Sequence, residues 1–237
     1  MGDAIQGLWV GARLSVMERL SIASFLKNGH PYILYTYGPV EGLPKGAELK
    51  DANEILPSSA IFTYTEHATC SGFSNFFRYK LLLERGGWWA DTDMICLKPF
   101  SFAVDFVFSS ERGGGGPIVN VGAIKVPAGS TVMQYAWDAC QRIDRTQLKW
   151  SQCGPLLAGA AVEACSLQGY VQPPEVFCPI HFLEWQKMLD PAETWQFSDA
   201  TRAIHCWNEL WRRSHQSKDD AYDSACLYES LKHRYLD

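Results

Sequence analysis

The stretch from Ser71 to Asp93 restricts the fold of this chain more than any other segment. Its first part, "SGFSNFFRYKLLLERGG", begins with a serine suited to cap a helix and ends on Gly86-Gly87, which predicts a helix of about four turns. Its second part, "WWADTD", predicts a strand with Asp91 and Asp93 at the carboxyl end. Because open α/β sheets bind ligands at the carboxyl ends of their strands, we expect a ligand site at these two aspartates.

Two carboxylates one residue apart repel each other unless a positive charge lies between them. In an extended strand, side chains two positions apart point to the same side, so Asp91 and Asp93 are expected to face one ligand. Carboxylate oxygens suit a hard divalent cation, and such a cation commonly also takes phosphate oxygens from a substrate. The pair therefore predicts a site for Mg²⁺ or Mn²⁺.

The segment before this stretch predicts a strand, a helix and a second strand. Residues 4–11 form a short apolar run closed by glycine, and residues 32–38 are rich in β-branched and aromatic side chains. Between them, Ser15 and Glu18 have the spacing of a capping box, and Asn28-Gly29 is a typical helix end. A strand, helix and strand within so few residues favour a parallel sheet and an α/β fold.

The remaining elements are predicted from the same signals. We expect strands over 105–110, 118–127 and 203–211, helices over 130–144, 154–169 and 221–236, and loops over 38–57 and 111–117. Internal repeats and linker-like segments are not evident. We therefore expect residues 1–237 to form a single domain.

Charge and composition exclude some classes of partner. Lys and Arg number 21 against 26 Asp and Glu, for a net charge of -5. A mildly acidic chain without a basic stripe lacks the electrostatic footprint of a nucleic-acid-binding protein. An anionic ligand must therefore be held locally, by a metal, an arginine or a helix end.

The sequence predicts a cytoplasmic protein without an integral membrane segment. Its eight cysteines are widely scattered and form no C-x-x-C pair, which favours thiols in a reducing compartment over a disulfide framework or a zinc site. The first residues lack the basic and apolar regions of a signal peptide. No apolar run approaches the roughly 20 residues of a membrane span.

A resemblance to a known family is carried by residues 73–100. The positions that carry it are Ser74, Asn75, Arg78, Tyr79, Leu82, Gly86, Gly87, Trp89, Asp91 and Asp93. Their order resembles the DXD-motif region of bacterial capsule and lipopolysaccharide glycosyltransferases, yeast mannosyltransferases and glucosylating clostridial toxins. That region reads, loosely, Ser-Asp-x-x-Arg-Tyr, then Leu, then Gly-Gly-aromatic and Asp-x-Asp.

The resemblance implies a GT-A-like nucleotide-sugar-binding fold, with a mainly parallel central sheet flanked by helices. It implies transfer of a hexosyl group, with retention at the anomeric carbon, from a nucleotide-diphosphate sugar to a glycan or other hydroxyl acceptor. The default donor is a UDP-sugar, with Mn²⁺ or Mg²⁺ as the cofactor. Neither the donor sugar nor the acceptor is specified by the sequence, and neither is the oligomeric state.

The resemblance also implies roles for the residues of the motif. Asp93 is expected to bind the metal directly, and Asp91 to hold the donor's ribose or sugar and reach the metal through water. Asn75 and Arg78 lie three residues apart on one helix face, so both can reach the same donor. The guanidinium of Arg78 has a fork that matches phosphate or sugar oxygens.

Weaker matches extend the resemblance to both ends of the chain. Trp9 in "GLWVG" stands where similar enzymes place a tryptophan near the nucleotide base, and Asn120 in "VNVGAIKVP" is expected at the donor or acceptor. His205 and Trp207 resemble a His-x-Trp segment, which implies a third metal ligand and a donor contact. Trp9 and His205 could instead be core residues, and Asn120 a turn residue. The remaining histidines, which are given no role, are His30, His67, His181, His215 and His233.

One departure from the family pattern leaves alternatives open. Asn75 stands where similar enzymes carry an aspartate, so a catalytically inactive nucleotide-sugar-binding domain is one alternative. A second is a phosphatase of the haloacid-dehalogenase type, whose motif is D-x-D-x-[TV]. Ile95 occupies the last position of that motif here, which disfavours the phosphatase.

Overall fold

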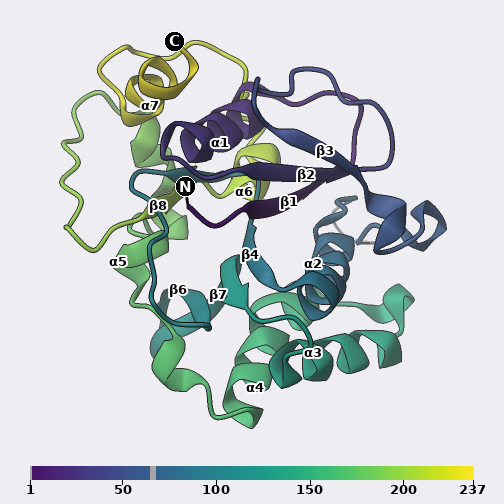
Figure 1. Ribbon diagram of the computed structural model, residues 1–237. Coiled ribbons are helices and arrows are strands. Elements are labelled where there is room, and N and C mark those ends of the chain that lie inside the picture. Colours follow the sequence, from purple (N-terminus) through teal and green to yellow (C-terminus); the bar gives the residue numbers. More distant parts are fainter. Residues whose placement is uncertain (1, 65–67) are drawn as a thin grey trace.

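The computed structural model describes residues 2–64 and 68–237, and its centre is a six-stranded sheet with helices on both faces (Figure 1). The strands follow the order β3 (Glu48–Asp51), β2 (Tyr32–Thr36), β1 (Ile5–Trp9), β4 (Gly87–Ala90), β7 (Gly116–Val126) and β6 (Val107–Gly113). The first four of these run parallel, and β7 and β6 are antiparallel to their neighbours. The predicted α/β fold with a mainly parallel sheet is therefore confirmed.

The predicted strand, helix and strand at the start of the chain are present. Helix α1 (Val16–Lys27) begins after Ser15, whose amide donates a 2.8 Å hydrogen bond to Oε2 of Glu18, one of the two contacts of the predicted capping box. Strands β1 and β2 pair in parallel, with Ile5 opposite Tyr32. On the same side of the molecule, α1 lies against the last helix, α7 (Leu227–Leu236) (Figure 1).

Helix α2 (Ser71–Arg85) covers the other face of the sheet together with α3 (Thr131–Arg142) and α4 (Leu157–Ala164). The cap residue of α2 is Cys70 and not Ser71, whose hydroxyl is buried with no hydrogen-bond partner among the described residues. Gly86 ends the helix as predicted, with a φ of 62°. A Cβ at Gly86 would lie 2.3 Å from the backbone nitrogen of Ala128, so only glycine fits this turn into β4.

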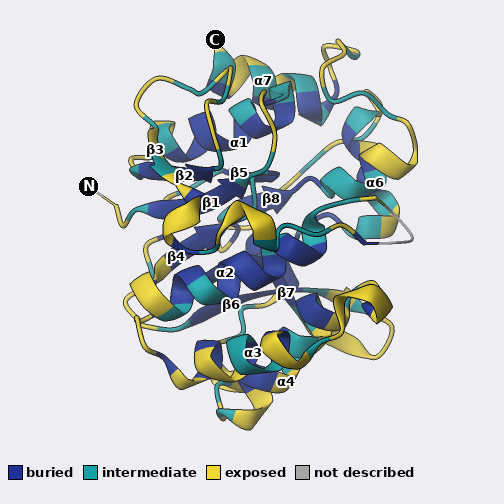
Figure 2. Cartoon of the chain, turned by 90° about the vertical axis from the view of Figure 1, so that its right-hand side faces the viewer, coloured by how far each residue is buried: buried dark blue, intermediate teal, exposed yellow. Residues whose placement is uncertain are grey.

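Strand β4 is buried on both faces by large aromatic side chains, as the layered burial in Figure 2 shows for the sheet as a whole. Trp88 packs with Phe100 and Phe177 on the side of α1, and Trp89 packs with Phe77 of α2 on the other side. Each buried aromatic side chain removes about 150–250 Å² from water, so β4 is held firmly in the middle of the sheet. It is this strand that leads into the two aspartates.

The strand predicted through residue 93 ends earlier, at Ala90. The backbone turns after it, and the amide of Met94 donates to the carbonyl oxygen of Asp91 at 3.0 Å. A new strand, β5 (Met94–Cys96), then pairs with β8 (Ala203–His205) in a separate two-stranded sheet. Asp91 and Asp93 therefore lie in a turn between two sheets, and the prediction of an extended strand there was wrong.

Other boundaries also differ from the prediction. The expected loop 38–57 contains β3, and the expected loop 111–117 is the end of the β6–β7 hairpin, in which Gly113 pairs with Gly116. The expected helix 154–169 is a π-helical turn, Gln152–Leu156, followed by α4. The expected strand 203–211 is only β8, followed by helix α6 (Asn208–Arg213). The last helix, α7, begins at Leu227 and not near residue 221.

The rest of the chain consists of short elements and loops. The short α5 (Pro174–Phe177) and a 3₁₀ helix, Phe182–Leu189, precede β8. All eight cysteines are free thiols. Among the described residues, none of the helices combines the length and apolar character needed to cross a membrane.

Candidate active site

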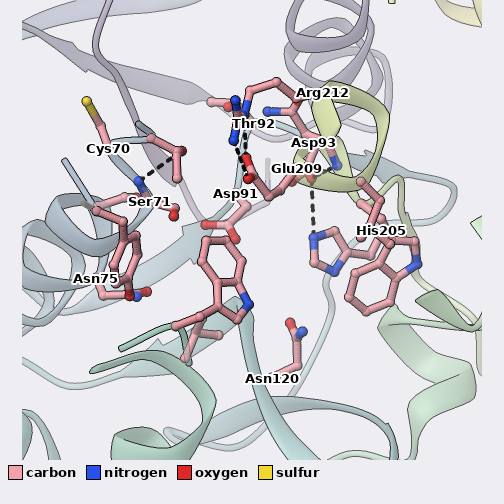
Figure 3. Close-up of a pocket in the computed structure, with 18 of the residues that line it drawn as sticks. Cys70, Ser71, Asn75, Asp91, Thr92, Asp93, Asn120, His205, Glu209 and Arg212 are labelled. Carbon is pink, nitrogen blue, oxygen red and sulfur yellow. Dashed lines mark hydrogen bonds and ion pairs between the residues drawn. The ribbon is translucent and has the colours of Figure 1, made fainter. Parts of the chain in front are cut away.

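A cavity of about 850 Å³ opens where the carboxyl ends of β1 and β4 meet the C-terminal part of the chain. This volume is in the range of pockets that hold small molecules. Its walls come from the end of β1, the beginning of α2, the turn at 91–93, the β6–β7 hairpin and α6. Figure 3 shows side chains from these separate segments directed into the same space.

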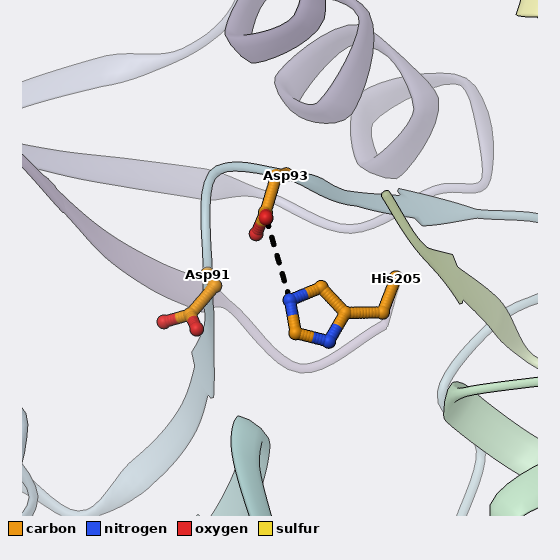
Figure 4. Close-up of side chains that lie close together, drawn as sticks. All are labelled: Asp91, Asp93 and His205. Carbon is orange, nitrogen blue, oxygen red and sulfur yellow. Dashed lines mark ion pairs between the residues drawn. The ribbon is translucent and has the colours of Figure 1, made fainter. Parts of the chain in front are cut away.

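Asp91, Asp93 and His205 meet inside this cavity. One potential ligand atom from each lies within 4.8 Å of the others, and Figure 4 shows Asp93 and His205 directed toward each other with Asp91 beside them. The turn after Ala90 places both carboxylates in this cluster, and the amide of Asp91 is fixed by a 2.8 Å hydrogen bond to the carbonyl oxygen of Gly122. His205 is placed beside them because β8 pairs with β5, with His205 opposite Met94.

Asp93 and His205 form a buried ion pair. The Oδ2 atom of Asp93 lies 3.3 Å from Nε2 of His205 and accepts a 2.8 Å hydrogen bond from the amide of Asn208. Burial alone would raise the pKa of Asp93, but the charge and hydrogen bond of His205 and the Asn208 amide hold it below its ordinary value. Burial alone would lower the pKa of His205, but the Asp93 carboxylate raises it well above its ordinary value.

Asp91 is held by a cation on its other side. Its Oδ1 atom lies 2.5 Å from a terminal nitrogen of Arg78 and accepts a 2.8 Å hydrogen bond from Nε1 of Trp89. The guanidinium carbon of Arg78 also lies 4.7 Å from the centre of the Trp89 ring. Because the second terminal nitrogen of Arg78 donates to Oδ1 of Asn75, both arms of the predicted fork already contact protein atoms.

Asn75 uses both ends of its amide. Its Oδ1 accepts from Arg78, and its Nδ2 donates to Sγ of Cys153 at 3.5 Å. The hydroxyl of Tyr79 binds the carbonyl oxygens of Cys153 and Gly154, at 3.0 and 3.2 Å, which fixes the π-helical turn against α2. An aspartate in this position would keep the acceptor for Arg78 but lose the N–H donor to the thiol.

The three remaining predicted residues also line the cavity. Trp9 lies at the end of β1, where its Nε1 donates to the carbonyl oxygen of Arg13 at 3.1 Å. Asn120 is buried on β7 and donates to the carboxylate of Glu111. Trp207 has a left-handed backbone conformation, with a φ of 58°, and its ring centre lies 4.0 Å from that of His205. Trp9, Asn75, Arg78, Asp91, Asp93, Asn120, His205 and Trp207 are thus brought together in one cavity.

Several polar residues of the cavity were not singled out in the sequence: Glu111, Glu209, Arg212 and Lys218. Glu111 falls in the loop expected over 111–117, which contains four consecutive glycines. Glu209, Arg212 and Lys218 lie in a charged stretch that resembles an ordinary solvated surface. No local pattern distinguishes them, because long-range packing brings them to the site. Of the histidines given no role, His67 lies outside the described residues.

The donor set fits a divalent cation such as Mn²⁺. Two carboxylates and one imidazole are acceptable ligands for Mn²⁺, which tolerates nitrogen as well as oxygen. The ligand atoms already lie near one another, and Asp91 is oriented from behind by Arg78 and Trp89. Asp91, Asp93 and His205 are therefore a candidate metal centre.

Comparisons with known proteins agree with this geometry. Residues 21–112 match the family described as glycosyltransferase sugar-binding region containing DXD motif, and residues 128–235 match the family described as alpha 1,4-glycosyltransferase conserved region. No curated protein sequence matches the chain significantly.

Among solved structures, the chain is similar to the PaToxG glycosyltransferase at 18% identity and a TM-score of 0.55, over 71% of this chain and 72% of that one. This likeness shows a shared fold. A structure of a doubly substituted transferase matches at 11% identity and a TM-score of 0.46, over 70% of this chain and 86% of that one. Two regions of the chain thus match glycosyltransferase families, and the DXD motif of the first region is Asp91-Thr92-Asp93 here.

Proposed function

We propose that this protein transfers a hexosyl group from a nucleotide-diphosphate sugar, by default a UDP-sugar, to a hydroxyl group of a glycan or another acceptor. The observation that carries the proposal is the meeting of Asp91, Asp93 and His205 inside a large cavity of a chain with two glycosyltransferase regions. The α1,4-glycosyltransferase region supports an α-linked product, and such a product from an α-linked donor requires retention at the anomeric carbon.

Asp91, Asp93 and His205 would hold Mn²⁺ or Mg²⁺. When bound, such a cation neutralises the charge that develops on a leaving diphosphate. Arg78 and Trp89 hold the Asp91 carboxylate, so this residue is in place before any ligand arrives. Such preorganised charges cost little rearrangement during the reaction.

Other residues of the cavity would bind the rest of the donor. The ring of Trp9 would stack on the nucleotide base, because it stands at the end of β1 within the cavity. Asn75, on α2, would face the sugar, and Arg78, whose terminal nitrogens bind Asn75 and Asp91, would position these two side chains for the donor. Trp207 would cover the donor beside His205. Asn120, with Glu111, would lie at the donor or acceptor sugar.

The substitution Asp93→Asn tests the metal assignment. We expect transfer from the UDP-sugar and Mn²⁺-dependent binding of UDP to be lost, because an amide oxygen is a weaker ligand than a carboxylate. The measurements are product formation and calorimetric titration of UDP with and without Mn²⁺. The folded state is checked by circular dichroism, and Asp199→Asn, which removes an exposed carboxylate, serves as the control. Full activity of the Asp93 variant would contradict the proposed metal site.

A catalytically inactive nucleotide-sugar-binding domain is the second candidate, favoured by Asn75. Hydrolysis or transfer of a UDP-sugar by the wild-type protein would exclude it. Binding of UDP and Mn²⁺ without any turnover, together with activity gained on Asn75→Asp, would support it. The phosphatase is disfavoured by the two glycosyltransferase regions.

A further inference from the structure

Lys218 is a cation of the cavity to which neither the sequence motif nor the family assigns a role. It lies in the loop between α6 and α7 and lines the cavity. Its Nζ forms an ion pair with Oε1 of Glu18, a carboxylate with no solvent exposure. The same Nζ lies 5.8 Å from the centre of the Trp9 ring.

Lys218 is held both at its side-chain ammonium group and at its backbone carbonyl oxygen. The second carboxylate oxygen of Glu18 accepts a 2.8 Å hydrogen bond from the amide of Ser15, as part of the capping box of α1. The carbonyl oxygen of Lys218 accepts a 2.8 Å hydrogen bond from the hydroxyl of Tyr228. A lysine held in this way has already lost much of its side-chain freedom, so binding a ligand costs less conformational entropy.

Lys218 lines the same cavity as the candidate metal centre, and its ammonium group lies beside the ring of Trp9. In the proposed function the base lies on Trp9 and the cation lies at Asp93. A diphosphate joins these two ends of the donor, and the ammonium group of Lys218, beside the Trp9 ring in the same cavity, is a cation available to it.

We propose that Lys218 binds the diphosphate of the donor and stabilises the leaving nucleoside diphosphate, while Glu18 positions the lysine. The inference rests on the proposed function. In the transfer, the bond from the anomeric carbon to the diphosphate oxygen breaks and its electron pair stays on the diphosphate. The acceptor oxygen bonds to the anomeric carbon, and the hydroxyl proton leaves to a phosphate oxygen or to solvent. The ammonium has three N–H donors, so it can keep Glu18 and still donate to phosphate.

The plain alternative is that Lys218 only neutralises a buried carboxylate. Two variants distinguish the two roles, because both remove the same ion pair. Lys218→Gln removes the cation, whereas Glu18→Gln keeps it and leaves it free to contact phosphate. A purely structural pair predicts the same loss of UDP affinity in both variants.

The experiment is calorimetric titration of UDP, uridine and inorganic pyrophosphate with Mn²⁺ present. For Lys218→Gln we expect the affinity for UDP and pyrophosphate to fall at least about tenfold, which is about 1.4 kcal/mol, with uridine unchanged. Glu18→Gln, which keeps the cation but loosens its position, should lose less UDP affinity than Lys218→Gln, and Lys218→Arg should recover most of the affinity. Lys98→Gln, which removes an exposed lysine paired with Asp199, controls for net charge.

The outcomes separate this inference from the function on which it rests. If the wild-type protein binds UDP and Lys218→Gln binds it equally well, the role of Lys218 is wrong and the proposed function stands. Equal losses in Lys218→Gln and Glu18→Gln would also overturn the inference. If the wild-type protein binds neither UDP nor pyrophosphate, the proposed function fails and the inference fails with it.

Discussion

Each aspartate of the DXD motif is paired with a different basic side chain of the protein. Asp91 is paired with Arg78 at 2.5 Å, and Asp93 is paired with His205 at 3.3 Å. The repulsion expected from two neighbouring carboxylates is therefore offset in part before a metal binds. The two partners differ, because arginine stays charged while histidine can give up its proton.

The Asp93–His205 pair predicts that metal binding releases a proton. A histidine ligand must be neutral, but in the metal-free protein the pKa of His205 is raised well above its ordinary value of 6.5. We expect the affinity for Mn²⁺ to increase as the pH rises toward this raised pKa. Calorimetry in buffers of different ionisation enthalpy measures the released proton, and His205→Ala should abolish the release and weaken Mn²⁺ binding at least about tenfold.

The pH dependence of folding stability has the opposite sign to that of Mn²⁺ affinity. A raised folded-state pKa means that His205 stabilises the metal-free fold fully below its unfolded pKa of about 6.5, and that this contribution is lost as the pH rises through the folded-state pKa. The stability difference between the wild-type protein and His205→Ala should therefore shrink with rising pH in EDTA. A difference that grows with pH, or metal binding without proton release, would contradict the assignment of His205.

Arg78→Lys is expected to be far from conservative. The guanidinium contacts Asn75 and Asp91 through different nitrogens and lies over Trp89, and an ammonium group cannot make these contacts together. Misplacement of Asp91 should lower the turnover number by about 10²-fold. The matched control is Arg85→Lys in the same helix, where the arginine is exposed and its nearest carboxylate is 3.8 Å away. An unchanged rate in Arg78→Lys would mean that the network does not position Asp91.

At the scale of the elements, the turn from α2 into β4 places the motif. Gly86 has a φ of 62°, and a Cβ there would collide with the backbone of Ala128. We expect Gly86→Ala to lower the free energy of unfolding by at least about 2–3 kcal/mol. Gly129→Ala is the control, because Gly129 has a φ of 70° but no atom within 4 Å of the added Cβ, and should cost about 1 kcal/mol. The free energy of unfolding is measured by urea denaturation. Equal decreases in the two variants would mean that the contact with Ala128 is unimportant.

Elements with local signals could be predicted from the sequence. The Ser15 and Glu18 pair, the glycines at 86–87 and the start of the helix predicted from residue 130 are local signals, and the structure has a helix boundary at each. The aspartate pair was also identified, because its chemistry is unusual whatever the backbone does. The exact end of β4 could not be predicted, since Trp-Trp-Ala-Asp is equally compatible with a longer strand.

Elements that depend on distant partners could not be predicted. Strand β3 has the charged sequence Glu48–Asp51 and exists because it pairs with the edge of β2. Helix α6 begins at Asn208, whose amide is bound by the carboxylate of Asp93 from 115 residues away. A local cap would have predicted this helix, but its cap comes from the other half of the chain. The cavity residues Glu111 and Lys218 were missed for the same reason.

At the scale of the whole molecule, the cavity is lined by residues from both of the regions that match glycosyltransferase families. The turn at 91–93 belongs to the sugar-binding region, whereas β8 and α6 belong to the α1,4-glycosyltransferase region. A ligand that binds only the native state stabilises it by mass action, by about 2.7 kcal/mol at a hundredfold excess over its dissociation constant. Ligand binding should therefore stabilise both regions of the chain together.

Hydrogen exchange tests this coupling. We expect Mn²⁺ and UDP together to slow amide exchange in 91–96 and also in 203–208, and to raise the melting temperature more than either one alone. The Asp93→Asn variant should lose the protection in both segments. Protection limited to one segment would mean that the two regions do not share the ligand.

The pairing of β5 with β8 also limits how such proteins can exchange parts during evolution. Asp93 comes from the first family region and His205 from the second, and a strand of only three residues holds them in line. A hybrid with the C-terminal half of a relative would take the two aspartates of the candidate metal site from one parent and the histidine from the other. A slip of one residue in this pairing turns His205 to the opposite face. Functional recombination would therefore depend on the alignment of these few residues more than on the similarity of the parents.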